Sequence, residues 1–186
     1  MVNSKQDKIL IAYFSRPGNN YVNGTILNLP VGNTEVLAQT IQEMTNGDIF
    51  RIDTVTPYPS DYKKTTEVAG KELREKARPK LSDKVKNMKV YTVVFLGYPN
   101  WWGTIPMPIA TFLSEYDFSG KTIAPFCTNE GSGLGRSIID IKELCPQSNV
   151  LDGFTVRGGA VNQARNKVSI WLHELGLQRK SILIQE

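Results

Sequence analysis

The residues best suited to chemistry lie in three segments, and the first of these has the groups that bind a phosphate. Residues 15–34 read SRPGNNYVNGTILNLPVGNT, and Gly32, Asn33 and Thr34 stand where a stretch with helical spacing begins. Backbone N–H groups are free at a helix start, and hydroxyl and amide side chains beside them complete an anion site. No GK[ST] sequence is present, which disfavours a nucleoside triphosphate with magnesium. An alternative role for Asn33 or Thr34 is to cap the helix. The polar residues Ser15 and Arg16, which open the segment, favour the phosphate site.

The second segment has two adjacent tryptophans and is suited to hold a flat ring. It reads GYPNWWG, so that Trp101 and Trp102 follow an apolar run and precede Gly103. Adjacent side chains on a loop rarely both point inward, so we expect at least one indole to be exposed and free to stack on a ring. Pro99 and Asn100 are typical of a turn that brings backbone amides to the edge of such a ring. The alternative is one core tryptophan and one surface tryptophan.

The third segment is rich in glycine and is suited to let the backbone approach a ligand closely. Residues 127–135 read CTNEGSGLG, with three glycines within five positions. Glycine adopts positive φ angles at little cost, and a plain connection would not require so many glycines. A rival interpretation is the dinucleotide fingerprint GxGxxG, since Asp152 follows at about the expected distance. Its final glycine would fall at Arg136, however, which weakens that interpretation.

Residues that commonly bind metals or act as catalysts are scarce. The chain has one histidine, His173, and two cysteines, Cys127 and Cys145, which lie too far apart for a CxxC motif. Histidine-based zinc sites and Ser-His-Asp chemistry would depend on that single histidine, for which a surface position is expected. We therefore predict no metal site and assign no catalytic residue.

Composition and charge exclude several classes of protein. With 186 residues, 40% of them hydrophobic, the sequence is typical of one globular domain, which we expect to span residues 1–186. A net charge of +4 is too small to indicate a nucleic-acid partner. The amino-terminal apolar run covers only residues 9–14, too short for a signal peptide or a membrane span. These features predict a cytoplasmic protein with neither a nucleic-acid nor a membrane partner.

The elements that position the three segments alternate between strand and helix. Short apolar runs typical of buried parallel strands are separated by stretches with helical spacing, which predicts an α/β fold with helices on both faces of a parallel sheet. Ligands bind at the carboxyl ends of the strands in such folds. Strands are predicted at 8–14, 48–53, 90–97, 122–127 and 153–157, and helices at 34–44, 61–77, 106–116, 134–144 and 160–175.

Taken together, the three segments resemble the flavodoxin family over nearly the whole chain. The first loop of flavodoxins has the form [ST]-x-T-G-N-T, whose start matches Ser15 and Arg16 and whose end matches Gly32, Asn33 and Thr34. Residues 17–30 form a long insertion between the two halves, which resembles a bacterial subgroup with an interrupted phosphate loop. Val31 stands where the motif usually has a hydroxyl residue. The resemblance implies a five-stranded parallel sheet of order 2-1-3-4-5 in a three-layer flavodoxin-like sandwich.

The resemblance also implies FMN as the cofactor and assigns residues to its two ends. Glu130 would lie beside the flavin. There its carboxylate either influences the charge of the flavin or a substrate, or is simply solvated. The residues implied for the phosphate are Ser15, Arg16, Gly32, Asn33 and Thr34; those implied for the two sides of the isoalloxazine are Pro99, Asn100, Trp101, Trp102 and Gly103, and Thr128, Asn129, Glu130, Gly131, Ser132 and Gly133.

A redox function follows from the resemblance, but two roles stay open. One is an electron carrier that docks on a redox partner protein; the other is an FMN-dependent oxidoreductase that takes hydride from NAD(P)H and reduces a quinone or another small acceptor. The absence of a strongly acidic surface weakens the carrier role, because carriers commonly use charge to steer docking. A flavin-free scaffold of the same fold is the least favoured alternative. Homodimers occur among similar flavin enzymes, although no interface can be identified in the sequence.

Overall fold

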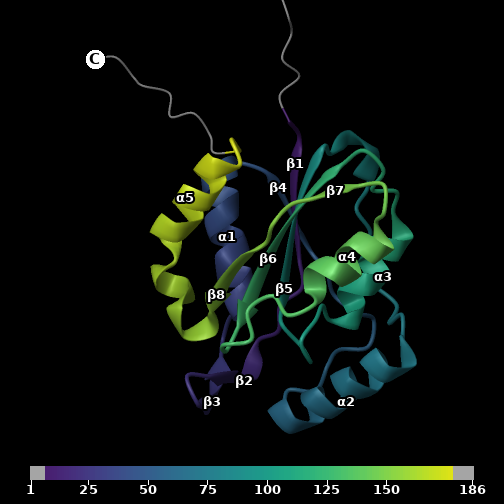
Figure 1. The fold of residues 1–186 in the computed structure, drawn as a ribbon. Coiled ribbons are helices and arrows are strands. Elements are labelled where there is room, and N and C mark those ends of the chain that lie inside the picture. The colour runs from purple at the N-terminus through teal and green to yellow at the C-terminus, as the bar shows by residue number, and fades with distance from the viewer. Residues whose placement is uncertain (1–6, 178–186) are drawn as a thin grey trace, which may run out of the picture.

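A central parallel sheet separates two layers of helices in the computed structural model, which describes residues 7–177 (Figure 1). Residues 1–6, on which the prediction about a signal peptide partly rests, lie outside this range. Every pairing within the main sheet is parallel, and the predicted order 2-1-3-4-5 is confirmed. The order is β4 (Asp48–Arg51), β1 (Ile9–Tyr13), β5 (Val93–Pro99) and β6 (Thr122–Asn129), with both β7 (Asn149–Val150) and β8 (Phe154–Arg157) paired to β6.

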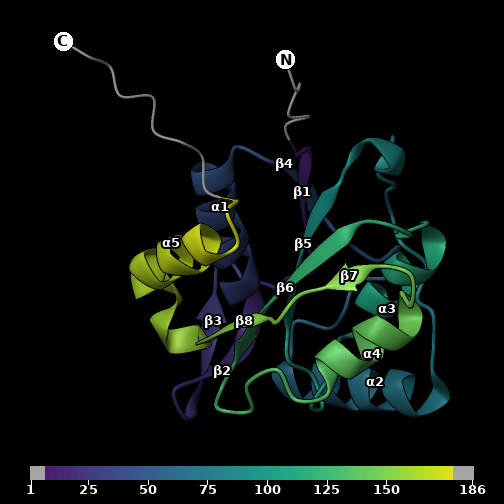
Figure 2. The ribbon, with the colours of Figure 1, turned by 45° about the horizontal axis from the view of Figure 1, so that its top comes forward.

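Helices cover both faces of the sheet, as Figures 1 and 2 show from two directions. One face is covered by α1 (Asn33–Thr45) and α5 (Arg165–Glu174), and the other by α3 (Met107–Glu115) and α4 (Ser137–Leu144). The remaining helix, α2 (Tyr62–Glu75), lies across the end of the sheet at which the strands finish. It is therefore placed to form one wall of any site at that end.

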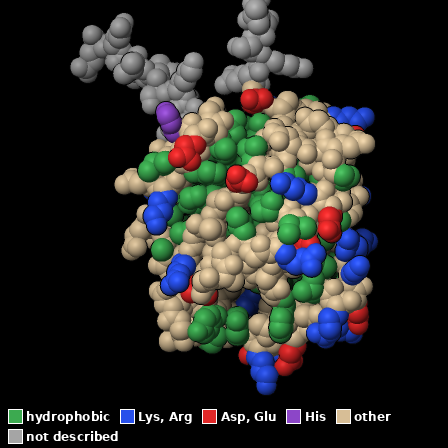
Figure 3. Space-filling model, viewed as in Figure 1, with side chains coloured by type: hydrophobic (Ala, Val, Ile, Leu, Met, Phe, Trp, Pro, Cys, Tyr) green, Lys and Arg blue, Asp and Glu red, His purple; other side chains and the backbone are tan. Residues whose placement is uncertain are grey.

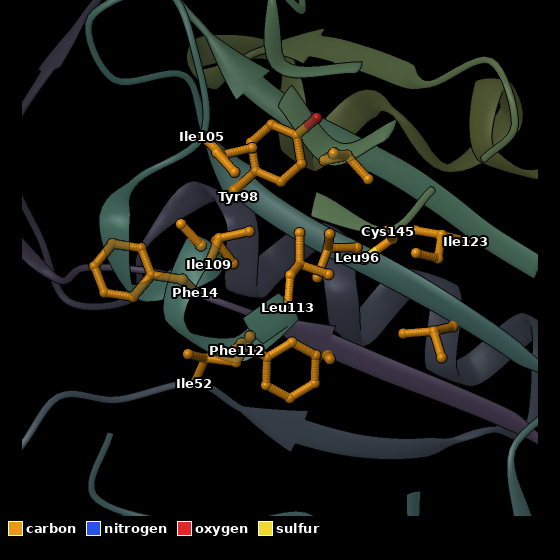
Figure 4. Close-up of a cluster of buried hydrophobic side chains, with 14 of the residues drawn as sticks. Phe14, Ile52, Leu96, Tyr98, Ile105, Ile109, Phe112, Leu113, Ile123 and Cys145 are labelled. Atoms are coloured by element: carbon orange, nitrogen blue, oxygen red, sulfur yellow. The ribbon is translucent and has the colours of Figure 1, made fainter. Parts of the chain in front are cut away.

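The central strand β5 shows why the two helical layers assemble. All but the last of its residues are buried, and alternate side chains point to opposite faces of the sheet. Phe95 packs in the cluster under α1 and α5, whereas Leu96 and Tyr98 pack in the cluster under α3. Figure 4 shows the second cluster, in which Leu96 lies near Phe112 and Leu113 of α3. A strand that is apolar on both faces is stable only when both faces are covered.

Three predicted element starts were wrong by three or more residues, and one of them belongs to the helix predicted from residue 134, which begins at Ser137. The strand predicted from residue 90 begins at Val93, because Met88–Val90 form a 3-10 turn that leaves Val90 40% exposed. The helix predicted from residue 160 begins at Arg165, after the 3-10 segment Gly158–Gln163. Two adjacent glycines open that segment, and glycine is a poor residue for an α-helix.

The insertion at residues 17–30, for which no conformation was predicted, forms a separate antiparallel hairpin. Its strands are β2 (Gly18–Val22) and β3 (Thr25–Leu29). Asn23 and Gly24 connect them with φ angles of 50° and 89°, and two consecutive positive φ angles are what a tight hairpin turn requires. The hairpin lies at the same end of the sheet as α2 (Figure 1).

Within residues 7–177, no helix has the length and apolar character needed to cross a membrane.

Candidate functional site

A cavity of about 230 Å³ lies at the carboxyl ends of β1, β5 and β6. Figure 3 shows a hollow near the lower end of the molecule, flanked by hydrophobic side chains. The cavity brings together the three segments singled out in the sequence. Its lining includes Ser15, Arg16, Asn33, Thr34, Pro99, Asn100, Trp101, Thr128, Asn129, Glu130 and Ser132, with Asn20, Tyr21, Tyr62 and Gly158 in addition.

The start of α1 offers unpaired backbone donors to this cavity. Gly32 is the N-cap, and no side chain caps the helix, so Asn33 and Thr34 do not serve as caps. The Glu35 N–H donates to Ser15 Oγ (3.1 Å), but within residues 7–177 the N–H groups of Asn33 and Thr34 have no hydrogen-bond partner. Two free amides at the positive end of a helix dipole are typical of an anion site.

Gly32 allows the residues before α1 to pack closely against those that follow β1. A Cβ atom at this position would lie 2.2 Å from Ser15 Oγ and 2.6 Å from the Arg16 carbonyl oxygen. Arg51, at the end of β4, holds the same loop from the other side: its guanidinium donates to the Ser15 carbonyl (3.2 Å) and pairs with Glu35 (2.6 Å). The loop is thus fixed before any ligand binds. Sequence analysis missed Arg51, because its partners come from segments far away in the chain.

Residues of the first and third segments meet beneath the cavity. Thr34 Oγ1 and Thr128 Oγ1 are 2.8 Å apart, and both side chains are buried. Asn33 and Glu130 both pack against Gly158, where a Cβ atom would lie 2.3 Å from Asn33 Nδ2 and 2.5 Å from Glu130 Oε1. The end of β6 and the start of α1 therefore form one continuous wall, and Gly158 is needed for that close approach.

The guanidinium of Arg16 donates its hydrogen bonds to backbone carbonyl groups. Its Nη1 donates to the carbonyls of Pro59 (3.1 Å) and Ser60 (3.2 Å), and its Nη2 donates to that of Asn19. Its Nε atom is buried and has no hydrogen-bond partner in the described part of the chain. Burial lowers the pKa of Arg16, but the side chain stays cationic at neutral pH. The guanidinium thus ties the hairpin to the turn before α2 and adds positive charge at the cavity.

The two adjacent tryptophans have different environments. Trp101 lines the cavity and packs edge-on against Phe14 (ring centroids 5.3 Å apart) and Tyr58 (5.1 Å). Trp102 is 62% exposed and lies over α2, where its Nε1 donates to the Thr66 carbonyl (3.0 Å). Only Trp101 lines the cavity, whereas Trp102 borders a neighbouring compartment.

Asparagines shape the two loops that border the cavity at its Trp101 end. Asn100 Nδ2 donates to the Gly133 carbonyl (2.8 Å), which joins the second segment to the third. Asn129 Oδ1 accepts from the N–H groups of Gly131 (2.8 Å) and Gly133 (3.0 Å). Gly103, Gly131 and Gly133 have positive φ angles and shape the loops without lining the cavity.

The inserted hairpin contributes Asn20 and Tyr21 to the lining of the cavity and contacts two of its walls. At its tip, the Asn23 N–H donates to Glu130 Oε2 (3.0 Å), and the same asparagine packs against Gly159. Along the strand, Tyr21 stacks on Tyr62 of α2 with ring centroids 6.2 Å apart. The hairpin is thus fixed to both sides of the site. Asn20, Tyr21 and Tyr62 were not among the predicted binding residues, because their placement depends on this hairpin.

The arrangement suits binding better than acid-base or metal chemistry. In the part of the chain that the structure describes, no three His, Cys, Asp or Glu residues are grouped to hold a metal. The cavity offers free amides, hydroxyls and a cation at one end and an indole at the other. An arrangement of this kind has the chemistry that suits an anionic group joined to a flat ring.

Neither cysteine is expected to react in the folded protein. Burial raises the pKa of the Cys127 thiol to about 12 and that of Cys145 to about 11. Because the thiolate is the reactive form, both side chains should resist the thiol reagent DTNB at pH 8 and react fully after unfolding in guanidinium chloride. Absorbance of the released thiolate measures this, and stoichiometric reaction of the native protein within minutes would contradict the described burial.

Comparison with known proteins relates this geometry to a family. The sequence model of a family described as Flavodoxin matches residues 8–175, which include all three segments. No curated protein matches the sequence.

Solved structures with the same fold include several flavoproteins. A candidate flavoprotein from Bacteroides eggerthii is 30% identical, with a TM-score of 0.74 over 91% of this chain and 98% of that chain. A second, from Bacteroides uniformis, is 26% identical, with a TM-score of 0.72 over 91% and 99% of the two chains. A flavoprotein from Lactobacillus acidophilus, solved in complex with FMN, is 21% identical, with a TM-score of 0.62 over 88% and 99%.

Proposed function

The chain belongs to the flavodoxin family, and from this premise we propose that it binds FMN in the cavity at the carboxyl ends of β1, β5 and β6 and acts as a redox protein. The observation that carries the proposal is the pair of free amides at Asn33 and Thr34, which face a cavity bordered by an indole. A phosphate and a flat ring are the two ends of FMN. FMN bound to the Lactobacillus acidophilus relative supports the same choice of ligand.

The donor set fits the phosphate end of FMN. The amides of Asn33 and Thr34, the Ser15 hydroxyl and the Asn33 side chain would bind the phosphate oxygens, and the nearby Arg16 adds positive charge. The carboxylate of Glu130 already accepts the Asn23 N–H. Glu130 still lines the cavity as a carboxylate, but the donors named above outnumber it.

The ring end would be held between the two loops that Asn100 joins. Pro99 to Trp101 would border one side and Thr128 to Ser132 the other. When bound, FMN supplies reversible one-electron and two-electron transfer. The indole of Trp101 presents a negative π face, so stacking on it would disfavour added negative charge on the ring and lower its reduction potential.

The contact between the hairpin tip and Glu130 should slow the release of FMN. Glu130→Ala removes the acceptor for the Asn23 N–H as well as a negative charge, whereas Glu130→Gln removes only the charge. Because a hydrogen bond contributes about 0.5–1.5 kcal/mol, we expect FMN to dissociate about two to ten times faster from Glu130→Ala than from Glu130→Gln. Stopped-flow flavin fluorescence measures both rates, and equal rates would show that the contact does not retain the cofactor.

Anaerobic reduction tests the redox role and separates its two forms. Rapid reduction of the FMN-loaded protein by NADPH or NADH, followed by turnover with a quinone, would identify an oxidoreductase. Reduction only by dithionite or a partner protein, with single-electron steps in a potentiometric titration, would identify a carrier. FMN that binds but cannot be cycled by either route would contradict the redox proposal.

A further inference from the structure

The chain contains two Asn-Gly dipeptides, Asn23–Gly24 and Asn46–Gly47, which have different surroundings in the structure. Asparagine loses its side-chain amide fastest when glycine follows it, because glycine has no side chain to keep its backbone nitrogen away from that amide. The first dipeptide forms the tip of the inserted hairpin, and the second lies where α1 ends. The fold therefore decides at which of the two sites this reaction can proceed.

The backbone nitrogen of Gly24 is accessible and free. Asn23 and Gly24 are both exposed, and a Cβ atom at Gly24 would have nothing within 4 Å. Within residues 7–177, the Gly24 N–H has no hydrogen-bond partner. An exposed N–H without a hydrogen bond loses its proton more readily than a bonded one. The hairpin tip thus provides a nucleophile and the room to form a ring with the Asn23 side chain.

The dipeptide at the end of α1 is held in place. The Gly47 N–H donates to Thr45 Oγ1 (3.3 Å), and the Asn46 N–H donates to the Gln42 carbonyl (2.8 Å). A Cβ atom at Gly47 would lie 2.6 Å from Ile11 Cδ1, so this glycine packs against the sheet. The same reaction at Asn46 requires these contacts to break first.

We propose that Asn23 is a site of spontaneous deamidation and that the product releases the hairpin tip from Glu130. The Gly24 nitrogen attacks Asn23 Cγ, the Cγ–Nδ2 bond breaks, and the Gly24 amide proton leaves with the side-chain nitrogen as ammonia. Water then opens the succinimide ring. Cleavage of the bond between the nitrogen and Cγ gives aspartate, and cleavage of the bond between the nitrogen and the backbone carbonyl carbon gives isoaspartate. Water is the only co-reactant, and no atom is oxidised or reduced.

Both products disturb the contact that fixes the hairpin tip. The Asn23 N–H donates to Glu130 Oε2 (3.0 Å), and a Cβ atom at Gly159 would overlap the Asn23 side chain. Aspartate at position 23 places a second negative charge near the Glu130 carboxylate, and like charges repel. Isoaspartate adds a backbone atom to a two-residue turn, which alters the pairing of β2 with β3. The tip then separates from the wall of the cavity.

Peptide mass spectrometry of the purified protein, incubated at mildly alkaline pH, tests the chemistry. We expect Asn23 to deamidate at least about tenfold faster than Asn46 in the folded protein, and the two rates to converge in guanidinium chloride, where both dipeptides are free. Recovery of isoaspartate as well as aspartate identifies the succinimide, because direct hydrolysis of the amide gives aspartate alone. A rate at Asn23 no greater than that at Asn46 in the folded protein would overturn the proposal.

Charge variants of the flavin-free protein test the release of the tip. Asn23→Asp should lower the protection of the position-23 amide against hydrogen exchange about two- to tenfold, as ¹⁵N NMR measures it. Adding Glu130→Gln, which removes the repulsion but keeps an acceptor, should restore most of that protection. Asn28→Asp adds the same charge to an exposed residue of β3 away from the turn and is the matched control.

Unchanged protection in Asn23→Asp, or an equal loss of protection in Asn28→Asp, would overturn the release of the tip from Glu130. Neither the mass spectrometry nor the exchange measurement requires a cofactor, so the proposal can fail independently of the proposed function. One consequence does rest on that function: Asn23→Asp should release FMN faster than Asn28→Asp.

Discussion

Replacing Asn33 with aspartate is expected to lower the affinity for FMN about 100-fold and to change the affinity for riboflavin less than about twofold. Asn33 is the first residue of α1 and lines the cavity beside the two free amides. A carboxylate there would face the phosphate, and two unit charges about 5 Å apart repel by about 3 kcal/mol at an effective dielectric constant of 20. Riboflavin lacks the phosphate and would not be repelled.

Fluorescence titration of both flavins into both proteins measures this difference. Asn33→Ala is the matched control, since it removes the side-chain amide without adding charge. It should lower the affinity for FMN about tenfold. Retained riboflavin binding would show that Asn33→Asp keeps its fold, which is expected because a negative side chain suits the first turn of a helix. Equal losses of affinity for FMN and riboflavin, or no loss of affinity for either flavin, would contradict the assignment of the phosphate to the start of α1.

Replacing Trp101 with alanine is expected to lower the affinity for FMN and for riboflavin alike, by about tenfold to 100-fold. Stacking of a flat ring on an aromatic side chain contributes about 1–3 kcal/mol, and both flavins have the same ring. The variant should also lose about 2–4 kcal/mol of unfolding free energy, because Trp101 packs on Phe14 and Tyr58. Denaturant unfolding of the flavin-free protein measures that loss separately from binding.

Trp101→Phe provides the matched control for this experiment. A phenyl ring retains an aromatic face and part of the packing, so affinity should recover most of the way toward that of the unaltered protein. If flavin affinity is unchanged in Trp101→Ala while stability falls, the indole serves the core alone, and the ring must be bound by other residues.

Much of the sheet was predictable, because burial on both faces leaves a clear pattern. The strands that became β1, β5 and β6 appear as uninterrupted apolar runs, and each is followed by polar or glycine-rich residues where it ends. Parallel connections leave few topologies for such a pattern. The first and third segments therefore meet, as the Thr34–Thr128 hydrogen bond shows.

The hairpin carried a local signal that sequence analysis did not use. Asn23 and Gly24 form the dipeptide most typical of a two-residue hairpin turn. The position of the hairpin on the rest of the protein cannot be read from any local pattern. Its tip contacts Glu130, which is 107 positions away in the chain, and Tyr21 stacks on Tyr62 of α2.

The roles of the adjacent tryptophans could not be separated in advance for a related reason. A single backbone angle decides them: the positive φ of Trp102 turns its indole onto α2 and leaves Trp101 beside the cavity. That angle is unusual for tryptophan, and it is compatible with the fold because Gly70 of the distant helix α2 makes room for the ring. Side-chain direction on a loop thus depends on a contact formed only in the folded protein.

The most direct test of the central claim is a titration of FMN into the purified, flavin-free protein, followed by flavin fluorescence and visible absorption. We predict saturable binding of one FMN per chain with a Kd below about 1 μM, which corresponds to about −8 kcal/mol. Absence of saturable binding at FMN concentrations up to about 1 mM would contradict the assignment of the cavity to this cofactor.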